Sequence, residues 1–297
     1  MNILIIGGLG FIGLGLSSRL IEMGHMITVI GRSPAPKPGA PEKLTYISAD
    51  TSQEGLWQDE IEKNQAIINL AGESIFCRWN NKSKKKIYDS RILTTRNIVK
   101  VINRAQTLFN ASAVGYYGFR EDEELTESAS AGDDFLAGVC KDWEEEAKKG
   151  SQKKARVVLT RFGIVLGKSG GALGQMIPAF KLYVGGPLGS GRQWFSWIHI
   201  EDLINGLLFL LDKPEIQGAV NLCAPNPVRN KDLARNLGKV LSRPAFIPAP
   251  ALALRMVLGE FGSVLLKGQR VIPAKLQEDK FKFLFPEIHP ALIDLIG

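Results

Sequence analysis

The first half of the chain alternates short runs of apolar, β-branched residues with longer stretches in which apolar residues recur at helical spacing. Buried strands are predicted at residues 3–6, 27–30, 44–47, 66–70, 107–112 and 156–165. Between them, helices are predicted at residues 11–23, 82–104 and 134–148. Continuously apolar strands separated by helices are typical of a parallel sheet covered on both faces. Because crossovers between parallel strands are right-handed, we predict an α/β fold with a doubly wound parallel sheet.

The sequence changes character after Gly167. Glycine-rich and proline-rich segments, such as residues 185–191, alternate with short helices and one isolated strand at residues 219–222. Irregular, loop-rich sequence that follows such a sheet usually forms part of a binding site. We therefore expect a first domain over residues 1–225, with a loop-rich insertion at about 167–196. A smaller, mainly helical C-terminal lobe over residues 226–297 would contribute to substrate binding.

Composition and charge exclude several classes of function. The 297 residues include only three cysteines, Cys77, Cys140 and Cys223, without CxxC spacing, and three scattered histidines. This pattern favours a reducing compartment, the cytoplasm, over a disulfide framework, and no metal site is predicted. Residues 1–16 are interrupted by glycines and lack a basic region, so no membrane partner is expected. The net charge of +7 suits anionic ligands, but the basic run at residues 82–86 lacks interleaved aromatics, so no nucleic-acid partner is expected.

A glycine turn follows the first predicted strand directly. Gly7, Gly10 and Gly13 are spaced as G-x-x-G-x-x-G and lead into the first predicted helix, with Phe11 and Ile12 inside the motif. The first glycine permits a tight turn, the second lets the backbone approach a pyrophosphate, and the third lets helix and strand pack closely. The free N–H groups at the helix start favour an anion. The motif predicts a dinucleotide-binding fold of the Rossmann type.

The end of the second strand indicates which dinucleotide is bound. An NAD-preferring site usually has an acid there for the ribose 2′-hydroxyl, whereas this chain has Gly31 followed by Arg32. A guanidinium binds phosphate bidentately and suits the 2′-phosphate of NADP(H). We therefore predict NADP(H) as the cofactor, with Arg32 as the discriminating residue. The alternative is an ordinary surface arginine after a strand.

With these residues in place, the chain resembles the extended short-chain dehydrogenase/reductase superfamily, and more closely its atypical NAD-dependent epimerase/dehydratase-like family with a C-terminal domain of unknown function. The resemblance runs nearly end to end. The segments that carry it are residues 8–13, 69–73, 89–91, 112–118, 161–167, 185–191, 197–199 and 268–273.

The resemblance implies a cofactor that lies across the carboxyl edge of the sheet. Leu70, Ala71 and Gly72 would pass beneath the adenosine ribose and pyrophosphate, with Glu73 next in the same motif. Ala113 and Val165 would approach the nicotinamide side together with Ser112. Arg91, on the helix after the fourth strand, would reach a phosphate or ribose; the alternative is a charge on the surface of that helix.

The same resemblance shows that the chain lacks a catalytic pair of residues found in other members. Catalytic members of the superfamily use a serine and a Tyr-x-x-x-Lys pair, but none of the five tyrosines here has a lysine four residues further on. Ser112 retains the serine position. Tyr116 and Tyr117, on the following loop, are candidates to present a phenol near the nicotinamide. The alternatives are that Ser112 caps a turn and that the tyrosines pack over the pocket mouth. Cys140, on the helix that normally carries the pair, is interpreted as an inert buried thiol.

The segment at residues 189–199 combines glycines, a cation, an amide and large aromatics. Such a mixture suits a planar or anionic substrate, and Arg192, Gln193 and Trp197 are the predicted contacts. The alternative is that the aromatics fill the core and Arg192 is solvated. His199 and Asp202 are assigned structural roles at a strand-to-helix junction.

Two functions remain open. The first is an NADP(H)-dependent oxidoreductase or epimerase-like enzyme that acts on a small polar metabolite. The second is a non-catalytic, redox-sensing protein that uses NADP(H) occupancy to control a partner. By analogy with related proteins, the helices at residues 82–104 and 134–148 would form the face of a homodimer.

Overall fold

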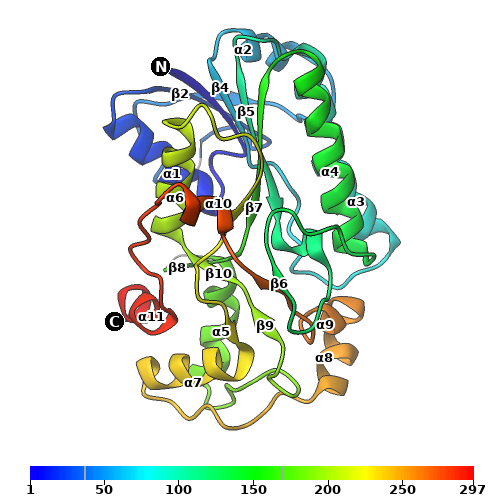
Figure 1. Ribbon diagram of the computed structural model, residues 1–297, viewed down its shortest axis with the longest axis vertical. Coiled ribbons are helices and arrows are strands. Elements are labelled where there is room, and N and C mark those ends of the chain that lie inside the picture. Colours follow the sequence, from blue (N-terminus) through cyan, green and yellow to red (C-terminus); the bar gives the residue numbers. More distant parts are fainter. Residues whose placement is uncertain (37, 169) are drawn as a thin grey trace.

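A seven-stranded parallel sheet forms the centre of the molecule (Figure 1). The computed structural model describes residues 1–36, 38–168 and 170–297. The strand order is β11-β7-β5-β4-β1-β2-β3, which confirms the doubly wound arrangement. The strands are β1 (Asn2–Ile6), β2 (Met26–Gly31), β3 (Thr45–Ser48), β4 (Ala66–Asn69), β5 (Thr107–Ala113), β7 (Arg156–Phe162) and β11 (Gly218–Leu222).

Helices cover both faces of the sheet because alternate side chains of each strand point in opposite directions. Ile3 and Ile5 of β1 belong to one buried cluster with α1 (Phe11–Glu22) and α6 (Ile200–Leu211). Leu4 and Ile6 belong to a second cluster, with α2 (Asp59–Glu62), α3 (Asn81–Val101) and α4 (Phe135–Gln152). Figure 1 shows α1 and α6 on one side of the sheet and α3 and α4 on the other. The three helices predicted for the first half are therefore present, with boundaries shifted by a few residues.

Two strand predictions need correction. The strand at residues 219–222 is not isolated, because β11 pairs in parallel with β7 and forms the edge of the main sheet. The strand predicted over residues 156–165 is two strands: β7 ends at Phe162, and β8 (Ile164–Gly167) pairs instead with β10 (Trp197–His199). Gly163 separates them where a Cβ would lie 3.0 Å from the Cβ of Cys223 and 3.1 Å from the backbone of Trp197. The chain therefore leaves the main sheet at a point of close packing.

A third buried cluster joins α5 (Gly171–Lys181), from the predicted loop-rich insertion, to α7 (Asn230–Leu241) and α11 (Ile288–Ile296) of the predicted C-terminal lobe; we refer to these parts together as the lobe. Three short strand pairs join distant segments: β8 with β10, β9 (Trp194–Phe195) with β12 (Val228–Arg229), and β6 (Glu124–Leu125) with β13 (Arg270–Val271). The remaining α-helices of the described residues are α8 (Ala251–Leu258), α9 (Glu260–Val264) and α10 (Ala274–Glu278). Through β13 and α10 the chain returns to the main sheet before it ends in α11 (Figure 1). The domain boundary between residues 225 and 226 stays a prediction.

His199 and Asp202 have the structural roles assigned to them. His199 is the N-cap of α6, where its Nδ1 accepts a hydrogen bond of 3.1 Å from the backbone N–H of Glu201. The Asp202 carboxylate accepts hydrogen bonds from the backbone N–H groups of Leu284 and Phe285, at 2.7 and 2.9 Å. These bonds fasten the last part of the chain to α6.

The buried imidazole of His199 leads to an expected pH dependence of stability. The side chain is 1% exposed, and burial lowers its pKa below the ordinary value of 6.5. Its stabilising contribution is therefore present above about pH 6.5 and is lost as the pH falls below it, because the unfolded state then binds the additional proton. We expect urea unfolding to show a lower free energy of unfolding at pH 5.5 than at pH 7.5. The loss should shrink in His199→Asn, since asparagine can also cap a helix; an unchanged loss in that variant would contradict the assignment.

Candidate functional site

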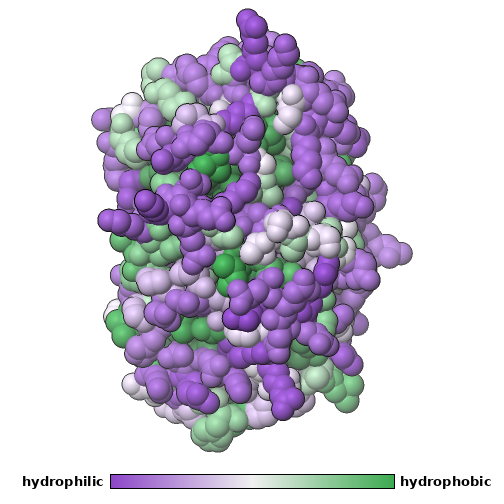
Figure 2. All heavy atoms as spheres, viewed as in Figure 1, coloured by the Kyte–Doolittle hydropathy of each residue, from purple (hydrophilic) through white to green (hydrophobic). Residues whose placement is uncertain are grey.

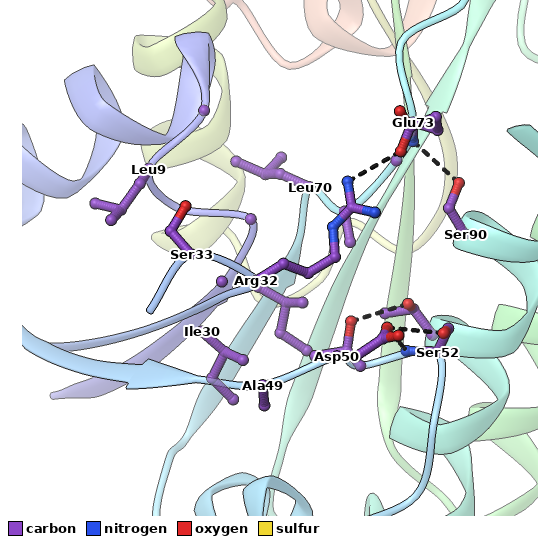
Figure 3. Close-up of a pocket in the computed structure, with 18 of the residues that line it drawn as sticks. Leu9, Ile30, Arg32, Ser33, Ala49, Asp50, Ser52, Leu70, Glu73 and Ser90 are labelled. Carbon is purple, nitrogen blue, oxygen red and sulfur yellow. Dashed lines mark hydrogen bonds and ion pairs between the residues drawn. The ribbon is translucent and has the colours of Figure 1, made fainter. Parts of the chain in front are cut away.

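A cavity of about 510 Å³ lies at the carboxyl ends of the central strands, next to the glycine turn (Figure 3). It opens beside β1, which has β2 on one side and β4 on the other. This is the point at which the order of strands reverses, where open α/β sheets bind ligands. Of the predicted cofactor residues, those that line the cavity are Gly7, Gly10, Arg32, Leu70, Ala71, Gly72 and Glu73.

The glycines of the turn stand where a side chain would meet neighbouring backbone atoms. Gly7 has a φ of +79°, and a Cβ on it would lie 3.1 Å from the backbone of Leu70 and Ala71. A Cβ on Gly13 would lie 2.5 Å from the backbone of Gly8, so α1 packs directly against the turn. Gly10 is the N-cap of α1 and provides no side-chain cap. The first N–H groups of α1 therefore have no side-chain cap, and they follow Gly10, which lines the cavity; free N–H groups at a helix start favour an anion such as a pyrophosphate.

Arg32 extends from the end of β2 across the mouth of the cavity (Figure 3). Its Nη2 lies 2.9 Å from Oε2 of Glu73, and the two side chains are 67% and 38% exposed. An ion pair this accessible contributes about 0–1 kcal/mol. Arg32 can therefore exchange Glu73 for a phosphate at small cost.

Sequence reasoning missed the part of the cavity that comes from β3 and α3. Asp50 follows β3, and its Oδ1 accepts hydrogen bonds from the backbone N–H and the hydroxyl of Ser52. Lys86 and Ser90 of α3 line the same cavity, and the Ser90 hydroxyl accepts a hydrogen bond from the backbone N–H of Glu73 at 3.0 Å. The position of Asp50 in the short segment after a predicted strand, at residues 44–47, was the available signal. For α3 the signal was the segment at residues 89–91, which carries part of the resemblance; which side chains of that helix face the cavity depends on how it crosses the sheet.

Arg91 lies beneath the loop that lines the cavity. Its Nη1 donates hydrogen bonds to the carbonyls of Glu73 and Ile87, at 3.1 and 2.9 Å, and its guanidinium lies 5.3 Å from the ring of Trp143. A Cβ on Gly72 would lie 2.9 Å from that guanidinium. The structure thus places Arg91 as a support for the Gly72–Glu73 backbone, and its predicted contact with the cofactor stays a prediction.

Phe11, Ile12, Gly13, Ala113 and Val165 are not among the residues that line the cavity. The Phe11 ring packs against the backbone at Gly167 and Gly171, where added Cβ atoms would lie 2.5 and 2.9 Å from it. Ala113 is the last residue of β5, and Val165 lies in β8. Ala113 thus stands at the carboxyl edge of the main sheet, and Val165 follows the end of β7 by three residues; the resemblance puts the nicotinamide side at this edge.

Ser112 and Tyr117 belong to a buried polar network. The Ser112 hydroxyl donates to Oε1 of Glu144 at 2.7 Å, and Arg161 binds both oxygens of that carboxylate, at 2.7 and 2.8 Å. The Tyr117 hydroxyl donates to Oδ1 of Asn221 at 2.6 Å and accepts from Nη1 of Arg161 at 2.9 Å. Burial raises the pKa of the Tyr117 phenol well above its ordinary value. Tyr117 is fully buried, so the structure does not support it as a proton donor at the cofactor.

Tyr116 differs from its neighbour in position. It is half-buried, and the Cζ of Arg161 lies 3.5 Å from its ring centroid. Burial also raises the pKa of the Cys140 thiol to about 11, which agrees with its interpretation as an inert thiol. Of the candidate proton donors, Tyr116 is therefore the one whose phenol is least enclosed.

The predicted substrate contacts are only partly exposed. Trp197 was wrongly chosen: it is fully buried in the core of the lobe, and its Nε1 donates to the carbonyl of Asn226 at 3.1 Å. Gln193 is half-buried and donates to the carbonyls of Leu188 and Leu265. Arg192 is exposed. The aromatic residues of this segment therefore fill the core more than they line a pocket.

The fold, the glycine turn and the cavity at the reversal of strand order together define a nucleotide-binding protein of the Rossmann type. The chain belongs to the NAD dependent epimerase/dehydratase family, whose model matches residues 3–223, and residues 249–295 match a domain of unknown function. Among the described residues, no helix combines the length and apolarity needed to cross a membrane.

Relatives of similar length support this membership. The chain is 42% identical over 298 residues to an Arabidopsis thaliana chloroplastic epimerase family protein, a homolog of SDR39U1, covering 98% of this chain and 86% of that one. It is 37% identical to the Bacillus subtilis epimerase family protein YfhF, covering 100% and 98% of the two chains. A crystal structure of human epimerase family protein SDR39U1 with NADPH matches with a TM-score of 0.86 and 34% identity, covering 100% and 99%.

Proposed function

We propose that this protein binds NADP(H) and acts as an oxidoreductase or epimerase-like enzyme on a small polar metabolite. The observation that carries the proposal is Arg32, which directly follows β2 at the mouth of the cavity, in place of an acid. The human relative crystallised with NADPH supports the same cofactor.

The residues of the cavity fit the parts of NADP(H). The backbone N–H groups after Gly7 and Gly10 would hold the pyrophosphate, and Arg32 would bind the 2′-phosphate. The loop from Leu70 to Glu73 would lie beneath the adenosine ribose, with Ala113 and Val165 toward the nicotinamide. When bound, the cofactor supplies hydride transfer.

The proton that accompanies hydride transfer needs another source than a Tyr-Lys pair. We propose Tyr116 for this role, with Arg161 against its ring. Ser112 would act by holding Glu144, because its hydroxyl proton is already donated there. Arg192 and Gln193 remain the proposed contacts to substrate from the lobe.

The non-catalytic, redox-sensing function remains the second candidate. It is favoured by the absence of the Tyr-x-x-x-Lys pair and by the engagement of Ser112 with Glu144. Oxidation of bound NADPH by carbonyl metabolites distinguishes the two functions, because only the enzyme consumes the cofactor. We further propose the cytoplasm as the location, given the three free cysteines, and a homodimer formed through α3 and α4.

The first test is a titration of the protein with NADPH and NADH, followed by nicotinamide fluorescence. We expect tighter binding of NADPH, and we expect Arg32→Ala to weaken NADPH about 10- to 100-fold with little effect on NADH. The reason is the loss of charge-assisted hydrogen bonds to the 2′-phosphate, worth about 1.5–3 kcal/mol each.

Glu73→Gln is the matched variant for this test. It removes the ion pair that competes for Arg32, so NADPH should bind as well as before or up to about fivefold more tightly. Equal binding of NADH and NADPH by the unaltered protein would overturn the assignment of Arg32 and leave the fold unaffected. Binding of neither would overturn the proposed function.

A further inference from the structure

A second cavity, of about 540 Å³, lies on the C-terminal lobe along α7, at the opposite end of the molecule from the label of α2 in Figure 1. We refer to it as the basic pocket. None of the residues that line it is acidic, and four are cationic: Lys231, Arg235, Lys239 and Arg243. The other lining residues are Pro187, Gly238, Ser242, Ala245 and Phe246. This cavity shares no lining residue with the one beside the glycine turn.

Three of the cations form a row on one face of α7. Lys231, Arg235 and Lys239 are four residues apart, all are exposed, and together they span about 12 Å of helix. Lys239 in the last turn complements the helix dipole, but Lys231 stands in the first turn, where a cation opposes it. The row is therefore not explained by the stability of the helix alone.

The charges of this row are largely uncompensated. Among the described residues, only Arg235 of the four cations forms an ion pair, with Asp232 at 3.4 Å. The Nε of Arg243 is buried without a hydrogen-bond partner, and its guanidinium lies 4.7 Å from the ring of Tyr183. The positive charge of Arg243 therefore adds to that of the row at the same pocket.

An apolar wall stands beside the cations. Phe246 is 77% exposed, although a phenyl ring gains free energy when it leaves water. Figure 2 shows hydrophobic residues interrupting the hydrophilic surface at this end of the molecule. A ligand with both an anionic chain and a flat or apolar part would contact both kinds of surface.

We propose that the basic pocket binds a small molecule that carries two or more phosphate groups. The row of cations is longer than one phosphate, and a chain of phosphates would contact several of these side chains at once. Lysine and arginine are the side chains that recognise phosphate oxygens. A site of this kind would give the protein a second anionic ligand besides the one at the glycine turn.

The test uses inorganic tripolyphosphate as the probe. The full chain, with one equivalent of NADPH so that the first cavity is filled and little NADPH is left free, is titrated by calorimetry at low salt. We expect measurable binding that the double variant K231E/K239E weakens at least tenfold. The matched control K280E/K282E reverses two exposed lysines in the segment after α10, makes the same change in net charge, and should bind as before.

Equal weakening by the two double variants would overturn the proposal, because binding would then reflect net charge alone. An absence of binding by the unaltered protein would overturn it as well. A second titration with ATP tests the apolar wall. If ATP binds more tightly than tripolyphosphate and Phe246→Ala removes this difference, the ligand is nucleotide-like. If ATP and tripolyphosphate bind equally, the phosphate chain is the recognised group. Both results support the pocket.

Discussion

Glu144→Ala is expected to lower the free energy of unfolding by about 3–5 kcal/mol, since it leaves a buried guanidinium without its counter-charge. Glu144 is 0% exposed and Arg161 is 3% exposed, and the two side chains share a bidentate contact. The substitution also removes the acceptor of the Ser112 hydroxyl. Urea unfolding at pH 7 measures the loss.

A double-mutant cycle separates the ion pair from simple packing. Replacement of both Glu144 and Arg161 by methionine should destabilise the protein much less than the sum of the two single replacements, because no unpaired charge remains. Additive losses would contradict the view that the pair acts as a unit.

The same network bears on the choice between the two proposed functions. Arg161 lies against the ring of Tyr116 and is held in place by Glu144, which also holds Ser112. One carboxylate, that of Glu144, thus binds Ser112 directly and holds Arg161 against the ring of Tyr116, the candidate proton donor. If the protein is an enzyme, this carboxylate acts as a positioning residue for Tyr116, not as a proton carrier. If it is a sensor, the network serves stability alone.

The sequence predicted the sheet well because the strands are continuously apolar and the glycine turn identifies the first of them. Strand boundaries and partners were harder to predict. The strand at residues 219–222 was predicted to be isolated because loop-rich sequence precedes it, yet its backbone pairs with β7. Pairing of this kind depends on contacts across about 60 residues, such as Gly218 with Val158, that no local pattern encodes.

The candidate site was predictable only where it follows the backbone. Gly7, Gly10 and Arg32 belong to one strand–turn–helix–strand unit, so their spacing along the chain fixes their places in space. Trp197 was chosen as a substrate contact, but it is buried; a large aromatic residue in the sequence is as typical of a core as of a pocket. The lobe buries it under α5 and α7, and only the tertiary packing distinguishes the two cases.

The basic pocket could not be predicted from spacing along the chain. Lys231, Arg235 and Lys239 are visible in the sequence at helical spacing, but solvated charges at that spacing are ordinary on a helix surface. Their importance depends on Arg243 and Phe246, which the turn after α7 brings to the same cavity. The cluster therefore emerges only from the fold.

Gly13→Ala is expected to weaken NADPH binding at least about 100-fold, a loss of about 2.7 kcal/mol in binding free energy. The added Cβ would lie 2.5 Å from the Cα, C and O atoms of Gly8, and backbone atoms cannot move aside as a flexible side chain can. The N-terminus of α1 must therefore shift away from β1, and the N–H donors proposed for the pyrophosphate shift with it. The same strain should lower the free energy of unfolding by about 1–3 kcal/mol.

Gly138→Ala is the matched control for this prediction. Gly138 lies within α4, and a Cβ on it would meet no atom within 4 Å. Alanine there should stabilise the protein by up to about 1 kcal/mol, since it forms helix more readily than glycine, and NADPH binding should not change. NADPH binding that survives in Gly13→Ala, with the protein folded, would show that the glycine turn serves packing and not the cofactor. The phosphates would then have to be held by side chains, of which Arg32 and Lys86 are the cations that line the cavity.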